Sequence, residues 1–437
     1  MTSTNPKHDA AGSTATQRGG DGISKALTIF LAASVAVIAL NLYASQPLIG
    51  LFGPALGMSA ATASFVTMAT LLGYGAGLVF LVPLVDLIPN RRLIVCTLAA
   101  CLGFLTLAAS TSSAAVFLAA SAGIGFTATA LQMLVPVAAA LAPVARRGRV
   151  VGNVMSGLML GTLLSRPIAS LMADAFGWRS FYVLMALLTT LASLALLKVL
   201  PDRRPAPSPI TYSGLIKSLG VLLREEAVLR RWAMSQFLLM GAFSVFWTIV
   251  ALRLAAAPFY FGQRELALFA LAASGALFIS PLAGRLADRG RTRAAAWCFH
   301  GAVAISVMLA GSVANGAWQL WEPAAFPSLS IGVMAAAAFL ISLGVTGNQI
   351  IGRHAINLIR PEARGRTNGL YTGIMFLGAA VAAFAAGSAW VHGGWSAVCW
   401  IGLLFALAAL LLLLKSHAGG SAQAQKTRGS EAIFTKL

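Results

Sequence analysis

The stretch Arg147–Trp178, RGRVVGNVMSGLMLGTLLSRPIASLMADAFGW, occurs a second time in weaker form at Arg364–Trp395, RGRTNGLYTGIMFLGAAVAAFAAGSAWVHGGW. A shift of 217 positions aligns the two copies without a gap and pairs nine identical residues in 32. Both copies begin with RGR, continue as a long apolar run and end at Gly-Trp. Because self-similarity at a fixed spacing is the signature of a repeated structural unit, the sequence predicts a duplication.

The duplication extends into the earlier part of each half, at a different spacing. A shift of 202 positions pairs Asp86 with Asp288 and Arg91 with Arg293. The change from 202 to 217 means that the second half carries 15 extra residues between these points. We expect this insertion within residues 311–330, GSVANGAWQLWEPAAFPSLS, on the outer side.

Composition predicts an all-α polytopic membrane protein. The chain is 58% hydrophobic and only 10% charged, with a mean hydropathy of +0.83, whereas soluble chains carry about 25% charged residues. Apolar runs of about 20 residues recur throughout, and each can cross a hydrocarbon layer of about 30 Å as a helix. The expected spans are 26–50, 61–84, 93–110, 114–142, 150–173, 179–199, 232–256, 265–284, 294–313, 328–357, 367–390 and 395–414.

These twelve spans divide into two six-helix, pseudo-symmetric bundles at residues 25–200 and 231–414. The only long polar stretch, residues 201–230, is expected to be a cytoplasmic linker between them. Residues 1–24, rich in Ser, Thr, Gly and Ala, are expected to form a disordered cytoplasmic tail rather than a signal peptide. Residues 415–437 are expected to form a second cytoplasmic tail.

The basic residues are placed asymmetrically. The net charge is +19, and all but four of the 31 Lys and Arg residues fall in the termini and alternate loops. The exceptions are Arg166, Arg179, Arg253 and Arg264. This is the positive-inside pattern, so we expect a multi-pass protein of the plasma membrane with both termini cytoplasmic. Basic loops this short favour anionic lipid headgroups and argue against nucleic acid as a partner.

No motif for enzyme chemistry is present. The four cysteines, Cys96, Cys101, Cys298 and Cys399, lie in apolar segments and are interpreted as small buried hydrophobes. The chain has no nucleotide-binding glycine loop, no Cys/His metal spacing and no Ser/His/Asp set at a common depth. We therefore expect neither an enzyme nor an ATP-driven pump, and no metal or cofactor.

Two loops resemble a known family signature. PLVDLIPNRR (83–92) and GRLADRGRTR (284–293) are similar to the loop motif of the major facilitator superfamily, between helices two and three and between eight and nine. NLYASQPL (41–48) resembles the first helix of many bacterial efflux-type, drug/proton antiporter-like members. The resemblance implies a monomer that moves a small organic solute by alternating access, with efflux as the direction and protons as the coupling ion.

The resemblance also implies that the two loops gate transport. A carboxylate beside several arginines forms charge-assisted hydrogen bonds that can hold the two halves together in one state. The gating residues implied are Asp86, Arg91, Arg92, Asp288, Arg289, Arg291 and Arg293. The alternative is that they set topology alone. The first copy departs from the family pattern, with Val82 in place of Gly and Leu87 in place of a basic residue.

Arg166 is the main anomaly of the repeat. Where antiporters of the superfamily carry Gly-Pro in the fifth helix, this chain has Arg166-Pro167. An arginine inside a span costs about 2.5–3.5 kcal/mol on insertion scales and usually faces a cavity. However, 16 residues from Val150 correspond to about 24 Å, which leaves the guanidinium within snorkelling reach of the outer surface. Both positions remain open.

Other polar side chains within the spans are candidates for a central cavity. They are Asn41, Tyr43 and Gln46 in the first span, Gln132 in the fourth, and Asn348, Gln349 and Arg353 in the tenth. Trp247 joins them from an aromatic stripe in the seventh span. The alternatives are ordinary interhelical hydrogen bonds for the polar set and packing or lipid contact for the stripe.

The acidic residues favour a second interpretation of the transport. All twelve lie in tails, loops or span ends, and His300 is the only histidine well within a span, so the residues themselves give proton coupling little support. Arg166 and Arg353 without buried carboxylates favour an uptake or exchange carrier for organic anions. A non-transporting membrane sensor or assembly protein is the alternative from another class.

Overall fold

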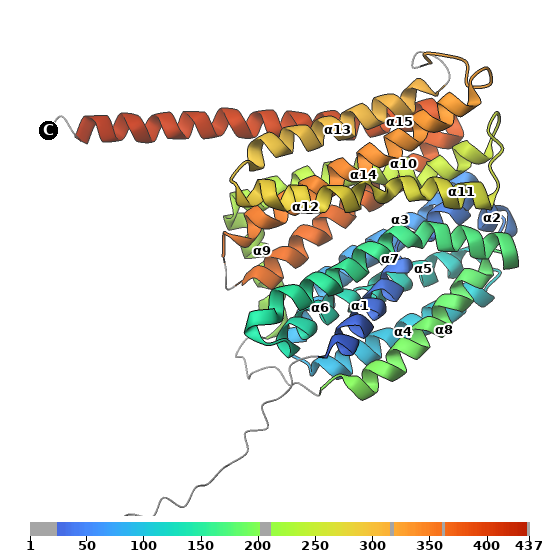
Figure 1. The fold of residues 1–437 in the computed structure, drawn as a ribbon, viewed down its shortest axis with the longest axis horizontal. Coiled ribbons are helices and arrows are strands. Elements are labelled where there is room, and N and C mark those ends of the chain that lie inside the picture. Colours follow the sequence, from blue (N-terminus) through green and yellow to red (C-terminus); the bar gives the residue numbers. More distant parts are fainter. Residues whose placement is uncertain (1–23, 202–210, 315–318, 361–362, 435–437) are drawn as a thin grey trace, which may run out of the picture.

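The computed structural model describes residues 24–201, 211–314, 319–360 and 363–434, and within these ranges the chain is helical without a strand (Figure 1). The first half contains α1 (Lys25–Leu40), α2 (Ser45–Ala55), α3 (Ala60–Phe80), η1 (Val82–Asp86), α4 (Asn90–Ser110), α5 (Ala114–Ala128), α6 (Ala130–Leu141), η2 (Val144–Arg146), α7 (Arg147–Phe176) and α8 (Arg179–Val199). The second half contains α10 (Ala227–Ala255), α11 (Gln263–Ala270), η3 (Leu271–Ser274), α12 (Gly275–Asp288), α13 (Thr292–Ser312), α14 (Pro327–Asn357) and α15 (Arg364–Phe434), and α9 (Tyr212–Glu225) lies between the halves. Apart from Ser24, the expected N-terminal tail lies outside the described residues.

Twelve membrane spans can be counted in the described ranges. Ten helical segments are long and apolar enough to cross a membrane, or eleven if the bent pair α1 and α2 is one span. One of them, Arg364–Lys415, has 52 residues and would be about 78 Å long, more than twice the thickness of a hydrocarbon core. Gly393 and Gly394 interrupt it with non-helical backbone angles. Counting it as two spans gives twelve, in agreement with the sequence prediction.

Three spans are broken near their middle. The chain bends by 41° between α1 and α2, and Thr129 separates α5 from α6. The third interruption is η3, between α11 and α12. Backbone that leaves the helix at membrane depth is tolerated where it is buried in protein or lines a cavity. Leu42 and Tyr43, in the first break, and Ala273, in η3, do line a cavity described below.

The duplicated stretch has the same local geometry in both copies. Gly177, after α7, has φ +82°, and the equivalent Gly394 has φ +58°, a region that favours glycine. Each glycine ends one span, and the following Trp begins the next, which accounts for the conserved Gly-Trp of the repeat. Close helix contacts are repeated too: a Cβ on Gly161 would lie 2.4 Å from the Ala36 carbonyl oxygen of α1. A Cβ on the equivalent Gly378 would lie 2.2 Å from the Phe237 oxygen of α10.

The two halves lie side by side, the first running from blue to green and the second from yellow to red (Figure 1). The arginine-rich first turns of α4, α7, α13 and α15, with the loops before them, lie at the end of the bundle near α9, here named the basic end. The end where α2 and α11 lie is named the opposite end. Helices α3 and α15 pack against each other, whereas α7 with α11 and α2 with α10 join the halves at the opposite end.

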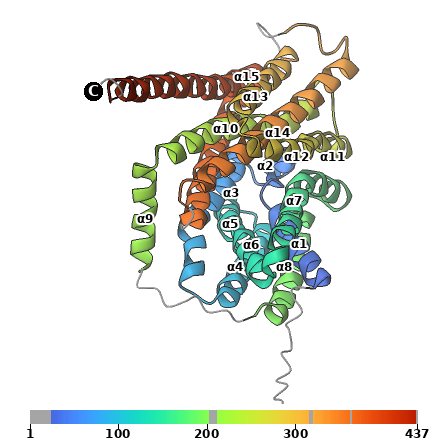
Figure 2. The same ribbon diagram turned by 60° about the vertical axis from the view of Figure 1, so that its left-hand side comes forward.

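The linker contains a helix, α9, that contacts both halves. Figure 2 shows it at the margin of the bundle, joined to α10. The Thr211 hydroxyl accepts a hydrogen bond from the backbone N–H of Gly214 and caps α9, whose Leu215, Leu219 and Leu222 are buried. The Tyr212 hydroxyl donates to the Phe80 carbonyl of α3 at 2.8 Å.

On the other side of the linker, Arg360 donates to Glu225 at 2.9 Å and to Glu226 at 2.7 Å. These two carboxylates raise the pKa of the Arg360 guanidinium above its ordinary value. Helix α10 begins at Ala227, within the residues 201–230 that were expected to form the polar linker. In the expected C-terminal tail, α15 remains helical to Phe434.

Candidate substrate cavity

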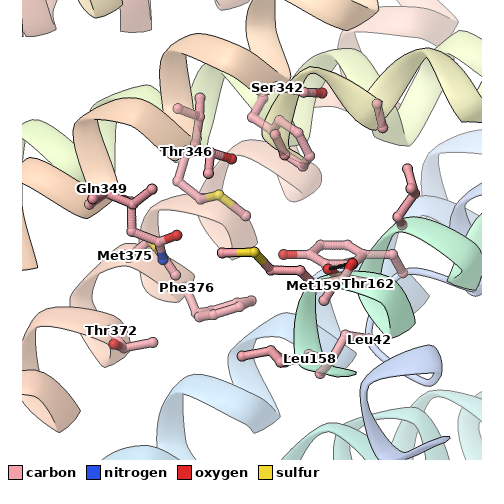
Figure 3. Close-up of a pocket in the computed structure, with 18 of the residues that line it drawn as sticks. Leu42, Leu158, Met159, Thr162, Ser342, Thr346, Gln349, Thr372, Met375 and Phe376 are labelled. Atoms are coloured by element: carbon pink, nitrogen blue, oxygen red, sulfur yellow. Dashed lines mark hydrogen bonds between the residues drawn. The ribbon is translucent and has the colours of Figure 1, made fainter. Parts of the chain in front are cut away.

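A cavity of about 260 Å³ lies between the two halves (Figure 3). Its first-half lining is Leu42, Tyr43, Tyr74, Gln132, Met155, Leu158, Met159, Thr162, Leu163 and Arg166. Its second-half lining is Met240, Phe243, Ala273, Ala276, Leu277, Ser342, Val345, Thr346, Gln349, Ile350, Arg353, Thr372, Met375 and Phe376. Side chains from α7, α14 and α15 converge on it in Figure 3, so both copies of the repeat contribute to its wall.

The lining is mostly apolar, with two cations. Four methionines supply flexible, polarizable surface that adapts to irregular ligands. Arg166 and Arg353 are the only charged members, since the described residues that line the cavity include no Asp or Glu and no His. The arrangement suits an amphipathic molecule that carries negative charge.

Arg166 lies in an aromatic cage. Its Cζ atom is 4.2 Å from the ring centroid of Trp247, 4.8 Å from that of Tyr43 and 5.5 Å from that of Phe243. Its Nε donates a hydrogen bond to Oε1 of Gln46 at 2.7 Å. Its Nη2 is buried and has no partner among the described residues. The guanidinium is thus held in place while part of its hydrogen-bonding capacity stays unused.

The packing of α7 against α1 explains this position. Gly157 and Gly161 face the carbonyl oxygens of Ala32 and Ala36, and the Ser165 hydroxyl donates to the Leu40 carbonyl. This small-residue stripe faces α1. The next side chain along the chain, Arg166, points about 100° further round the helix, toward α2 and α10.

The structure decides between the two positions considered for Arg166. The residue is 19 positions from the start of α7, about 28 Å, and its side chain is only 3% exposed. The guanidinium stays among the aromatic rings and does not reach the outer surface. Snorkelling is therefore the wrong alternative, because Tyr43, Trp247 and Gln46 offer the cation interactions inside the bundle.

Gln46 and Trp247 close the cavity behind Arg166. Neither lines the 260 Å³ cavity, but both line a separate space of about 10 Å³ on the other side of the guanidinium, together with Leu266 and Phe269. Arg166 borders both spaces. The side chains around it therefore form a partition between the cavity and the opposite end.

Arg353 lies four residues before the end of α14, near the basic end. Its Nη2 donates to the Thr372 hydroxyl at 3.3 Å, and its Nε is buried without a partner among the described residues. Beside it, Gln349 donates to the Met375 sulfur at 3.0 Å. The cavity thus runs from a caged arginine to a second arginine that is one turn of helix from the basic end.

Gln132 completes the set of predicted residues in the lining. Its Nε2 donates to the Tyr74 hydroxyl at 3.1 Å, and the Tyr74 ring meets Phe376 edge-on, with centroids 4.6 Å apart. Gln132 and Gln349, equivalent in the repeat, both line the cavity.

Asn41 and Asn348 lie outside the cavity lining, contrary to expectation. Asn348 is fully buried and donates to Gln236 at 2.7 Å and to Ser235 at 3.3 Å, between α10 and α14. The Ser235 hydroxyl also bonds Nε2 of His300 at 3.0 Å. Asn41 donates back to the Ile38 carbonyl at 3.3 Å, in the α1–α2 break. Asn348 thus makes the interhelical hydrogen bonds that were the alternative for this set, whereas the bond of Asn41 is local.

The two signature loops differ in structure. Asp288 ends the regular helix α12, and its carboxylate is 4.0 Å from Nδ1 of His354. Asp86 instead ends the 3-10 segment η1, which begins at Val82, and it is exposed with no ion pair in the described ranges. The remaining gating candidates, Arg91, Arg92, Arg289, Arg291 and Arg293, lie at the basic end beside α4 and α13.

At the opposite end the two halves are linked directly. Nε of Arg264, on α11, is 2.6 Å from a carboxylate oxygen of Asp174, on α7. The packing of α7 against α11 at the opposite end is therefore reinforced by an ion pair.

Several lining residues were not anticipated from the sequence. Tyr74, Thr162, Met155 and Met159 lie on α3 and α7, and Met375 and Phe376 on α15. In apolar spans such side chains resemble those that face lipid. The available signal was the repeat itself, because Met155, Met159 and Thr162 lie inside its first copy and Met375 and Phe376 inside its second.

Comparison with known proteins points in one direction. A sequence model of the Major Facilitator Superfamily matches residues 31–343. The chain is 34% identical over 390 residues to the putative uncharacterized transporter YgaY of Escherichia coli K12, covering 89% of this chain and 95% of that protein. It is 31% identical over 373 residues to the probable transporter SCO4007 of Streptomyces coelicolor, covering 84% and 82%.

Solved structures share the fold. The nucleoside transporter NupG superposes with a TM-score of 0.69 at 13% identity, covering 90% of this chain and 99% of that chain. The human organic anion transporter MFSD10 (TETRAN) superposes with a TM-score of 0.56 at 17% identity, covering 88% and 98%.

Proposed function

This chain belongs to the major facilitator superfamily of membrane transporters, and on that premise we propose that it carries a small amphipathic organic anion by alternating access. One observation supports the anion above all: Arg166 and Arg353 line a cavity whose described lining contains no carboxylate. A buried cation without a counter-ion is costly, so a ligand that brings a negative charge gains more here than a neutral one.

The size and surface of the cavity limit the substrate. A volume of about 260 Å³ lies below the range of about 300–1,000 Å³ typical of ligand pockets, so the substrate is small. The methionine and aromatic lining favours an apolar body attached to the anionic group. The shared fold with an organic anion transporter agrees with this class, as an analogy of fold.

We place the basic end in the cytoplasm and the protein in the plasma membrane, from the positive-inside pattern. The cavity would then be reached from the cytoplasm, as efflux requires. In this scheme the Asp86 and Asp288 loops close the basic end in the other state, while the Asp174–Arg264 pair opens.

Coupling to protons is the less favoured mechanism. The described lining offers no Asp, Glu or His to exchange a proton with the substrate, so we propose exchange or facilitated movement of the anion without covalent chemistry.

Flux measurements in proteoliposomes test this proposal. Radiolabelled monocarboxylates, dicarboxylates and organosulfates are compared with neutral amides and cations of matched size. We expect anions to be moved preferentially, with little effect of an imposed pH gradient. A preference for cations or neutral amides would overturn the anion assignment, and strict dependence on the pH gradient would restore proton coupling. Absence of flux for every compound would favour a sensor.

A further inference from the structure

A second crevice, of about 240 Å³, lies at the basic end and outside the cavity between the halves. It is formed within the second half by α10, α13 and α15. Its lining is Val228, Arg231, Trp232, Ser235, Thr292, Arg293, Ala296, Leu412 and Leu413. None of these residues belongs to the lining of the substrate cavity, so the crevice needs a separate explanation.

The mouth of the crevice is positively charged. Arg231 comes from the second turn of α10 and Arg293 from the first turn of α13, so two helix N-termini converge here. Neither arginine takes part in an ion pair within the described ranges, and the lining has no Asp or Glu. Two helix N-termini with two free guanidinium groups are suited to a phosphate.

The acidic residues nearest in sequence are already occupied. Glu225 and Glu226, just before α10, bind Arg360. Asp288, just before α13, faces His354. The positive charge of the mouth is thus not compensated by the loops that carry it.

The deeper part of the crevice is apolar. Trp232, Ala296 and Leu412 line it, and Ser235 forms its floor with a hydroxyl already bonded to His300. Ser235 is eight residues from the start of α10, which is about 12 Å along the helix axis. The crevice is therefore deep enough to reach from the lipid headgroups to the first part of their acyl chains. On α15, which carries Leu412, the side chains of Leu404, Leu411 and Leu414 are 51–65% exposed, as expected of a lipid-facing surface.

We propose that this crevice binds one anionic phospholipid. Its phosphate lies between Arg231 and Arg293 at the start of α13, and an acyl chain runs along Trp232 and Leu412. Basic pockets between membrane helices at the cytoplasmic side are suited to such headgroups. An apolar slot continuous with a charged mouth fits a lipid better than a free phosphate ion.

The first half provides an internal comparison. Arg91 is equivalent to Arg293 in the repeat, but the space beside it, with Leu200 and Pro201, is only about 10 Å³. That volume cannot hold a headgroup. The duplicated arginine is thus present in both halves, and the space beside Arg293 is much larger than the space beside Arg91.

Lipid binding to the purified full-length protein in detergent tests the proposal. Thermal unfolding and native mass spectrometry are recorded with phosphatidylglycerol, with phosphatidylcholine of the same chains, and with inorganic phosphate. We expect one phosphatidylglycerol per protein, bound at least about tenfold more tightly than phosphatidylcholine, with a raised Tm that phosphate does not reproduce. Arg231→Gln with Arg293→Gln should abolish this preference, whereas Lys198→Gln, a basic residue at the same end outside the crevice, should keep it.

A second variant separates the lipid from its phosphate. Leu412→Trp keeps both arginines and fills the apolar slot, so we expect it to weaken phosphatidylglycerol binding. It also provides the test if the double arginine variant does not fold. Equal binding of the two lipids to the wild-type protein would overturn the proposal. So would a preference that survives in both variants, or an equal stabilisation by inorganic phosphate, which would identify a simple ion site.

Discussion

At the residue scale, Arg166 is the residue on which the proposed anion site depends most. Removing a guanidinium from water costs several kcal/mol. Three aromatic faces at about 0.5–2 kcal/mol each and the bond to Gln46 offset part of that cost. Nη2 of Arg166 has no partner among the described residues, so a ligand that binds it would offset the rest of this desolvation cost. The cavity wall therefore holds a cation that is positioned but not neutralised by the described residues.

Arg166→Gln should lower kcat/KM for the anionic substrate at least about tenfold, because a hydrogen bond to a charged group contributes about 1.5–3 kcal/mol. Arg166→Lys should recover only part of the loss, since an ammonium lacks the planar fork that fits a carboxylate. Initial rates in proteoliposomes measure both. Arg224→Gln, on the exposed side of α9, is the control. Wild-type rates in Arg166→Gln would remove this residue from the substrate site.

Gln46→Glu tests the same site by adding charge instead of removing it. A carboxylate oxygen would take the place of Gln46 Oε1, which lies 2.7 Å from Nε of Arg166, and would form an ion pair with the guanidinium. We expect substrate affinity to fall at least about tenfold, while Gln46→Met leaves the cation free and binds more tightly than Gln46→Glu. Equilibrium binding of the labelled anion compares them. Equal affinity in the two variants would contradict an anion site at Arg166.

At the scale of the element, close backbone contact holds each half together. In α7 the glycine stripe brings the helix onto α1, and Gly378 does the same between α15 and α10. Such contacts depend on the absence of a side chain and on van der Waals packing, the main association force between helices in lipid.

Gly161→Val should therefore lower the Tm by several degrees or prevent folding, because its Cβ would meet the Ala36 backbone. Gly378→Val should have a similar effect in the second half. Gly152→Ala, on the same helix as Gly161 with no atom near its Cβ, should be neutral or slightly stabilising. Thermal unfolding in detergent compares the three. A Tm of Gly161→Val equal to that of Gly152→Ala would show that the stripe is not needed.

The same elements show how far the sequence could predict the structure. Apolar length located the spans, and the Gly-Trp repeat located two equivalent turns, because glycine is needed where φ is positive. The direction of each side chain was harder to predict. Asn348 and Gln349 are neighbours, about 100° apart on α14, and only Gln349 faces the cavity. Since lipid and protein interior are both apolar, hydrophobic periodicity does not tell cavity from core.

At the scale of the whole molecule, the structure would be one state of the alternating-access cycle that we propose. The halves are joined at the opposite end by Asp174 and Arg264, and the cavity extends toward the basic end. An exposed ion pair contributes about 0–1 kcal/mol, so this contact alone does not fix the state. In the proposed cycle, this pair marks the place where the two halves would separate.

Cross-linking this contact should stop transport. In a background with the four native cysteines replaced by alanine, Asp174→Cys and Arg264→Cys are joined by a short bismaleimide. We expect transport to be lost in the linked protein, because the opposite end cannot open, and retained in each single-cysteine variant given the same reagent. Undiminished flux through the fully linked double variant would mean that the halves do not separate there.

The absence of carboxylates from the described lining has an electrical consequence. If no proton accompanies the substrate, a monovalent anion crosses with its charge uncompensated. A potential of 100 mV, negative inside, then performs about 2.3 kcal/mol of work on each outward-moving charge. That corresponds to about a fiftyfold accumulation outside at equilibrium. A carrier whose described cavity lining has two arginines and no Asp, Glu or His would thus export its substrate using the resting membrane voltage as its only source of energy.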